Sequence, residues 1–188
     1  MLMNESAEFD LAVRLRSEGA MLGDIFAFIS GLYFRGKFAY SSAFAAPPPG
    51  LPGSLVITAG LGLLPPATRI TLADMRSIAD VPIDLANPLY RNPLERDATS
   101  LFRAIPSDCD VVLLGSIATP KYLVPLIDIF GSRLLFPSDF VGRGDMSRGG
   151  LMLRCAREGT ELDYIPAPAA IRRGARPPKL TKLNRSIR

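Results

Sequence analysis

The stretch DVVLLGSIATPKYLVPLIDIFGSRLLFPS, residues 110–138, decides the expected fold. Its apolar run at 111–114 ends at Gly115, which is typical of a buried strand that feeds a loop. Residues 120–130 have helical spacing and stop at Gly131, and a second apolar run follows at once. The stretch therefore predicts a strand, a helix and a second strand, the order found in parallel sheets.

Further helices and strands surround this unit. Apolar residues at helical spacing predict two N-terminal helices within 8–44, and the proline-rich segment 45–53 is expected to connect them to the rest. The remaining expected elements are a strand at 55–58, a helix at 72–80 capped by Thr71, a helix starting at Asn92, a helix at 146–158 and a strand at 161–167. Tyr90 and Arg91 are expected in an extended, exposed loop.

This order predicts an α/β fold in which a small, about four-stranded parallel sheet is sandwiched by helices. At 188 residues, the chain is expected to form one domain over 1–170, followed by a basic tail over 171–188. The tail has seven basic residues and no acidic one, which leaves 15 basic and 18 acidic residues in 1–170. Such a tail can bind nucleic-acid phosphates or an acidic protein partner, and a solvated tail without a partner is an equally weighted alternative.

Residue types that the chain lacks exclude several function classes. The sequence contains no histidine, so Ser-His-Asp and Cys-His catalysis have no base and a structural zinc site loses its usual ligands. We expect no metal and no cofactor, with Cys109 and Cys155 as free thiols in a cytoplasmic protein. No secretory leader is visible, and the apolar run at 25–34 is too short to cross a membrane, so it predicts a buried helix.

Two of the expected strands end in glycine, at the edge where open α/β sheets bind their ligands. Gly60 and Gly62 follow the strand at 55–58, and Gly115 and Ser116 follow the strand at 111–114. Their backbone amides can surround an anion, although a strand that ends in glycine more often simply turns there.

The loop after the third strand is the strongest candidate for a phosphate site. It combines backbone freedom, arginine side chains and a helix start within a dozen positions: Pro137, Ser138, Gly142, Arg143, Gly144, Asp145, Ser147 and Arg148. Arginine presents planar donors that match phosphate oxygens, and the helix N-terminus, with Asp145 or Ser147 as its cap, favours anions. The alternative is a structural loop, with a capped helix and an internal Arg-Asp pair.

A second cluster of basic and aromatic residues lies near the end of the N-terminal helices. It contains Tyr33, Arg35, Lys37 and Tyr40, near the end of the second expected helix. Aromatic rings beside cations can clamp a nucleobase or its backbone, but a helix surface with extended cationic side chains is the somewhat stronger interpretation.

The segments VVLLGSIAT and LLFPSDFVGRGDMSRGG, within 110–150, resemble the last two motifs of uracil-DNA glycosylases. The resemblance implies a parallel sheet between helices, and it places Pro137 and Ser138 at the positions that contact the DNA backbone. Most of the chain also looks like a bacterial family of unassigned activity that is itself glycosylase-like.

The sequence departs from the glycosylase pattern at the positions that carry the reaction. Phe136 stands where the superfamily has a histidine that stabilises the departing base, and residues 58–62 contain no carboxylate to position water. Asp145 is the candidate catalytic residue that remains. The resemblance therefore supports the fold better than the reaction.

Three functions remain as hypotheses. The first is a protein with a glycosylase-like domain that binds nucleic acid or a nucleotide, and the sequence leaves open whether it also acts on the glycosidic bond. The second is a non-catalytic interaction protein that docks on an assembly through its basic tail. The third is an enzyme that acts on a nucleotide or sugar phosphate in the same pocket.

Overall fold

A computed structural model describes residues 2–170, 174–175, 177–178 and 180 of the chain. Its helices are α1 (Asp10–Ser17), α2 (Leu22–Phe44), α3 (Leu72–Asp80), α4 (Pro88–Ala104), α5 (Pro120–Phe130) and α6 (Asp145–Glu158). Its strands are β1 (Ala20–Met21), β2 (Val56–Thr58), β3 (Gly62–Leu64), β4 (Arg69–Ile70), β5 (Val111–Val112), β6 (Leu134–Pro137) and β7 (Tyr164–Pro166). The predicted α/β class is confirmed, and most of the basic tail predicted over 171–188 lies outside the described residues.

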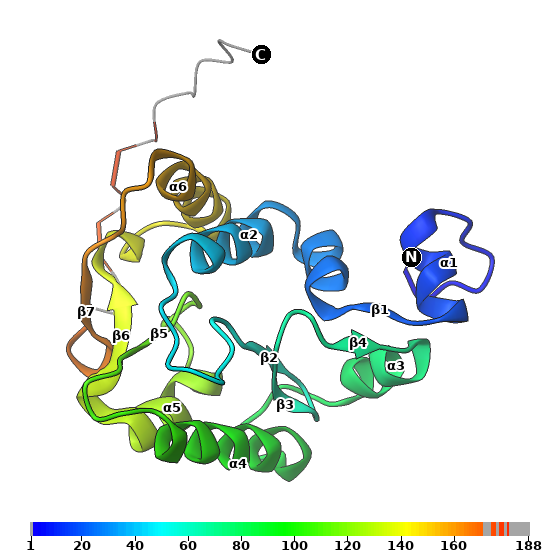
Figure 1. Cartoon of the computed structure of the whole chain (residues 1–188), viewed down its shortest axis with the longest axis horizontal. Coiled ribbons are helices and arrows are strands. Elements are labelled where there is room, and N and C mark those ends of the chain that lie inside the picture. Colours follow the sequence, from blue (N-terminus) through cyan, green and yellow to red (C-terminus); the bar gives the residue numbers. More distant parts are fainter. Residues whose placement is uncertain (1, 171–173, 176, 179, 181–188) are drawn as a thin grey trace.

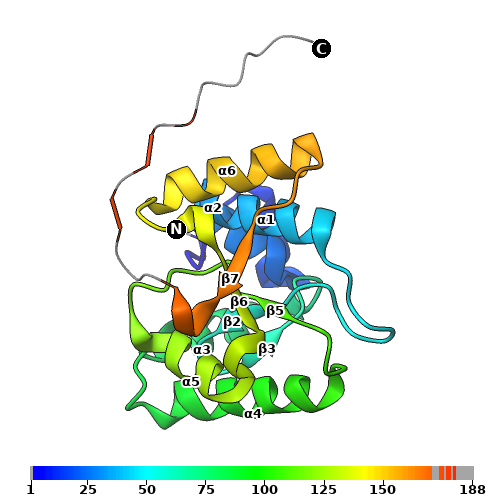
Figure 2. The same ribbon diagram turned by 90° about the vertical axis from the view of Figure 1, so that its left-hand side faces the viewer.

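The largest described sheet has the order β5-β6-β7. Strands β5 and β6 are parallel, with Val111 opposite Leu134, as the stretch 110–138 predicts. Strand β7 runs antiparallel to β6, with Phe136 opposite Ile165. In Figures 1 and 2, α2 and α6 lie above this sheet, and α4 and α5 lie below it. The parallel pair follows the sequence-based expectation.

The prediction of about four parallel strands is wrong, because the largest described sheet has three strands and β7 is antiparallel. The strand predicted at 55–58 does not join the β5-β6-β7 sheet, because β2 pairs with β3 as an antiparallel hairpin. Gly60 and Gly62 have φ values of 84° and 76°, which allow the chain to reverse within a few residues. These glycines therefore close a hairpin where the sequence suggested a longer crossover to a parallel strand.

Helix α4 begins earlier than predicted. The Asn87 side chain accepts a hydrogen bond from the backbone N–H of Leu89, and Pro88 occupies the first turn. The same signals recur at Asn92 and Pro93, where the sequence predicted the start of the helix. Tyr90 is consequently only 1% exposed in α4, and its prediction in an exposed loop is wrong.

Three other local predictions can be compared with the structure. Thr71 caps α3 in a capping box with Asp74, as predicted. Helix α6 has Gly144 at its N-cap without a side-chain cap, so the prediction that Asp145 or Ser147 caps it is wrong. The helix predicted to be buried at 25–34 belongs to α2, but Phe28 is 44% exposed, so this helix is buried on one side only.

The packing of α2 against α6 brings two helix backbones unusually close together. A β-carbon on Gly36 would lie 2.8 Å from Cα of Gly149, and one on Gly149 would lie 2.7 Å from the carbonyl oxygen of Leu32. Only glycine fits such a close crossing. The crossing fixes the position of the α2 side chains relative to the start of α6.

No helix in the described part of the chain is both long enough and apolar enough to cross a membrane.

Candidate functional site

A cavity of about 1050 Å³ lies between α2, the connector that follows it, the β2-β3 hairpin, α4, α5 and β5. This volume is at the upper end of the range of roughly 300–1,000 Å³ that is typical of small-ligand pockets. Most of its lining is apolar, and phenylalanine rings and prolines of the 45–55 connector contribute to it. Flat, partly apolar ligands fit walls of this kind.

All five tyrosines of the chain line this cavity: Tyr33, Tyr40, Tyr90, Tyr122 and Tyr164. Burial raises the pKa of both Tyr33 and Tyr90 to about 12, so these two phenols stay neutral and keep their donor protons at neutral pH. The cavity therefore combines an apolar wall with hydroxyl groups.

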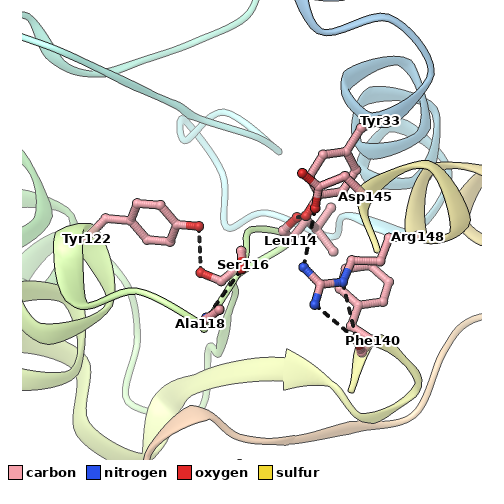
Figure 3. A network of polar contacts seen from close by, with 8 residues as sticks. All are labelled: Tyr33, Leu114, Ser116, Ala118, Tyr122, Phe140, Asp145 and Arg148. Carbon is pink, nitrogen blue, oxygen red and sulfur yellow. Dashed lines mark hydrogen bonds and ion pairs between the residues drawn. The ribbon is translucent and has the colours of Figure 1, made fainter. Parts of the chain in front are cut away.

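The hydroxyls of Tyr33 and Tyr122 bind the chain just beyond β5. Tyr33 donates to the carbonyl oxygen of Leu114 at 3.2 Å, and Tyr122 donates to that of Ser116 at 2.5 Å. Figure 3 shows these two phenols approaching the same segment from α2 and α5. Gly115 makes this approach possible, because a β-carbon there would lie 2.9 Å from the Tyr122 hydroxyl.

Tyr40 and Tyr164 form a chain of hydrogen bonds at another part of the wall. Their hydroxyl oxygens are 2.6 Å apart, and Tyr164 donates to the carboxylate of Glu161 at 2.7 Å. Since Tyr164 uses its proton on Glu161, Tyr40 is the donor to Tyr164, and Tyr40 accepts from the N–H of Leu162 at 2.9 Å. These bonds connect α2 to the start of β7.

Lys37 differs in burial from the other charged residues of the cavity lining. It is half-buried, whereas the other charged lining residues, Asp108, Asp110, Lys121 and Glu161, are exposed. Its ammonium nitrogen lies 4.0 Å from the ring centroid of Tyr33.

The pKa of Lys37 is lowered by burial, and this effect outweighs the opposing attraction of Asp145. Among the described residues, the ion pairs shorter than 4 Å do not include Lys37. Lys37 therefore presents a positive charge that no carboxylate neutralises at contact distance.

The guanidinium of Arg148, in contrast, is already used within the protein. Arg148 is only 8% exposed, and it donates to the carbonyl oxygen of Phe140 from Nε at 3.2 Å and from Nη2 at 3.1 Å. Its Nη1 lies 3.5 Å from a carboxylate oxygen of Asp145. Figure 3 shows Arg148 between Asp145 and Phe140. Arg148 thus ties the start of α6 to the turn at Phe140, which is the structural alternative considered for this loop.

The other predicted residues of the 137–148 loop also contact their own chain. Arg143 donates to the carbonyl oxygen of Asp139 at 2.9 Å and to Ser147 at 3.4 Å, and Ser138 donates to the carbonyl oxygen of Asp163 at 3.3 Å. Pro137 is buried at the end of β6. None of these four predicted residues lines the cavity.

The remaining predicted residues are divided between the cavity and other places. Tyr33, Lys37 and Gly115 line the cavity, and the carbonyl of Ser116 holds Tyr122. Arg35 is exposed and lies outside the lining. Gly60 and Gly62 form the hairpin turn, where Thr58 donates to the carbonyl of Gly62 at 2.8 Å.

Sequence reasoning did not identify Tyr90 or Tyr122 as site residues. Each is the third residue of a helix that starts with proline, α4 or α5, so a local signal for the helix start existed. No local signal indicated that the two side chains would face one cavity, because their helices are brought together only by the tertiary fold.

Within the described residues, no group of three or more histidine, cysteine or carboxylate side chains is arranged to hold a metal ion. Comparisons with models of protein families, with curated proteins and with solved structures gave no match to this chain.

Proposed function

We propose that this protein binds a nucleotide in the cavity, with the ring against the apolar wall and the phosphate at Lys37. The observation that carries this proposal is the half-buried Lys37, which lies in a large and mostly apolar wall and has no carboxylate of the described residues within 4 Å. An anion at Lys37 would recover electrostatic energy that the unpaired ammonium group lacks in the protein alone.

The surroundings of Lys37 support a phosphate better than a simple apolar ligand. Tyr33 lies under the ammonium group, and Lys121 adds a second, exposed cation to the lining. The aromatic and proline side chains of the wall suit the flat ring of a nucleobase. A nucleotide combines both chemical parts in one molecule.

The proposal also includes a reaction, hydrolysis of the glycosidic bond, which rests on the resemblance to uracil-DNA glycosylases. Water would add to C1′ of the sugar, the bond from C1′ to the base nitrogen would break, and the base would leave with a proton. Asp145 is the candidate group that the sequence leaves; its carboxylate is paired with Arg148 and lies outside the cavity lining, but it interacts electrostatically with Lys37 and Tyr33. Free base produced by the protein and lost in Asp145→Asn would support this step.

Isothermal titration calorimetry with the four common ribonucleoside 5′-monophosphates tests the binding proposal. Lys37→Met should weaken binding at least tenfold, because it removes the charge and keeps the apolar stem. Arg35→Met is the matched control, since it removes one charge two positions away on the same helix but outside the cavity, and it should change affinity less than twofold.

Two results would contradict the proposal. One is the absence of binding for all four nucleotides, and the other is equal weakening by Lys37→Met and Arg35→Met. Binding of nucleic acid that survives Lys37→Met but is lost on removal of 174–188 would instead favour an interaction protein that acts through its tail.

A further inference from the structure

One phenol in the cavity wall has no hydrogen-bond partner among the residues that the structure describes. Tyr90 is 1% exposed, and its oxygen is a buried polar atom without a hydrogen bond. The other four phenols each have a partner. A buried hydroxyl without a partner loses its bonds to water and gains nothing in return, so it destabilises the unliganded protein.

Tyr90 and Tyr122 offer complementary hydrogen-bonding capacity in the same wall. Both side chains line the cavity, and their helices α4 and α5 pack against each other. The hydroxyl of Tyr122 has already donated its proton to Ser116 and can only accept. The hydroxyl of Tyr90 has both its donor and its acceptor capacity free.

We infer that Tyr90 is the residue that recognises the ring of the ligand, through a hydrogen bond from its hydroxyl to an acceptor on the ring edge. This inference rests on the proposed function, and it deepens it by assigning the substrate class. The ligand is a heteroaromatic ring with hydrogen-bonding atoms on its edge, as nucleobases have. A hydrocarbon ring of similar size would leave Tyr90 unpaired and would bind more weakly.

The test compares each nucleoside 5′-monophosphate with phenyl phosphate, which has a flat ring and a phosphate but no polar ring edge. Tyr90→Phe should weaken nucleotide binding about five- to tenfold, the effect of one lost hydrogen bond, and should leave the affinity for phenyl phosphate unchanged. In the intact protein, the nucleotide should bind more tightly than phenyl phosphate.

The thermal stability of the unliganded variants gives an independent measurement. Tyr90→Phe should melt at the same temperature as the intact protein or higher, because it removes an unpaired hydroxyl. Tyr40→Phe is the matched control and should melt at a lower temperature, since it removes the donor to Tyr164 and the acceptor for Leu162. A Tyr90→Phe variant that melts clearly lower would mean that its hydroxyl is bonded within the protein, and would overturn the inference.

The two proposals fail in different ways. If nucleotides bind and depend on Lys37, but Tyr90→Phe binds them as tightly as the intact protein, the role of Tyr90 is wrong and the proposed function stands. If neither the nucleotides nor phenyl phosphate bind, the proposed function fails, and the role of Tyr90 fails with it.

Discussion

The 137–148 loop and the wall of the cavity both contain cationic side chains, and they use them differently. In the loop, Arg148 and Arg143 donate to carbonyl oxygens of their own chain. In the wall, Lys37 has only the ring of Tyr33 at contact distance among the interactions described. The comparison shows that a cation is available to a ligand only when the fold leaves it without a partner.

A substitution where α2 crosses α6, at Gly36 and Gly149, should give the largest effect on stability. Gly149→Ala would place its β-carbon 2.8 Å from Cα of Tyr33, in backbone that cannot easily move. We expect a loss of about 3 kcal/mol in the free energy of unfolding, despite the higher helix propensity of alanine.

The neighbouring glycine provides the control for this substitution. A β-carbon on Gly150 would meet only a side-chain atom of Leu180 at 3.7 Å, which is an ordinary contact. Gly150→Ala should therefore be neutral or stabilising by up to about 1 kcal/mol. Urea unfolding of both variants measures the difference, and equal effects would show that α2 and α6 are not held in close contact at Gly149.

The difference between the two arginines of the loop should be the next largest. Arg148→Met should lower the free energy of unfolding by about 2 kcal/mol, because it removes two buried hydrogen bonds to the carbonyl oxygen of Phe140. Arg143→Met should cost about 0.5 kcal/mol, since its bond to Asp139 is exposed. A larger loss for Arg143→Met, measured by the same unfolding method, would reverse the structural ranking of the two residues.

Alkaline pH should produce a smaller effect, and one that is confined to the cavity. Because burial raises the pKa of Tyr33 and Tyr90 to about 12, the folded protein keeps protons between pH 10 and 12 that the unfolded chain loses. Stability should therefore fall as the pH rises above 10, by about 1 kcal/mol per tyrosine at pH 11.

Tyr90→Phe isolates one of these two contributions. In denaturant unfolding at pH 8 and pH 11, the variant should lose about 1 kcal/mol less than the intact protein over this interval. An identical loss in both proteins would show that the phenol of Tyr90 titrates normally and is not buried in the cavity wall.

Local sequence signals predicted the β5-α5-β6 unit and the α3 cap because these depend on neighbouring residues. The stop at Gly131 and the cap at Thr71 are of this kind. The signals failed where the partner of a strand depends on the tertiary fold. The glycines after β2 fit either a crossover or a hairpin, and nothing in residues 55–62 states which strand will be the partner.

The candidate site shows the same division. The sequence identified Tyr33 and Lys37 as a basic-aromatic pair, and both line the cavity. It also favoured Arg143 and Arg148, because a sequence shows that an arginine is present but not which carbonyl oxygens will occupy its donors. Tyr90 was missed for a similar reason, since a hydroxyl without a partner is visible only once the surrounding fold is known.

A crystal structure of the protein with a bound nucleoside 5′-monophosphate would test most directly whether the cavity, and not the loop, is the binding site. We expect the phosphate within hydrogen-bonding distance of the Lys37 ammonium group and the base against the apolar wall, with its edge at the Tyr90 hydroxyl. A nucleotide bound to the 137–148 loop, with its phosphate on Arg143 and the cavity empty, would contradict the proposed function.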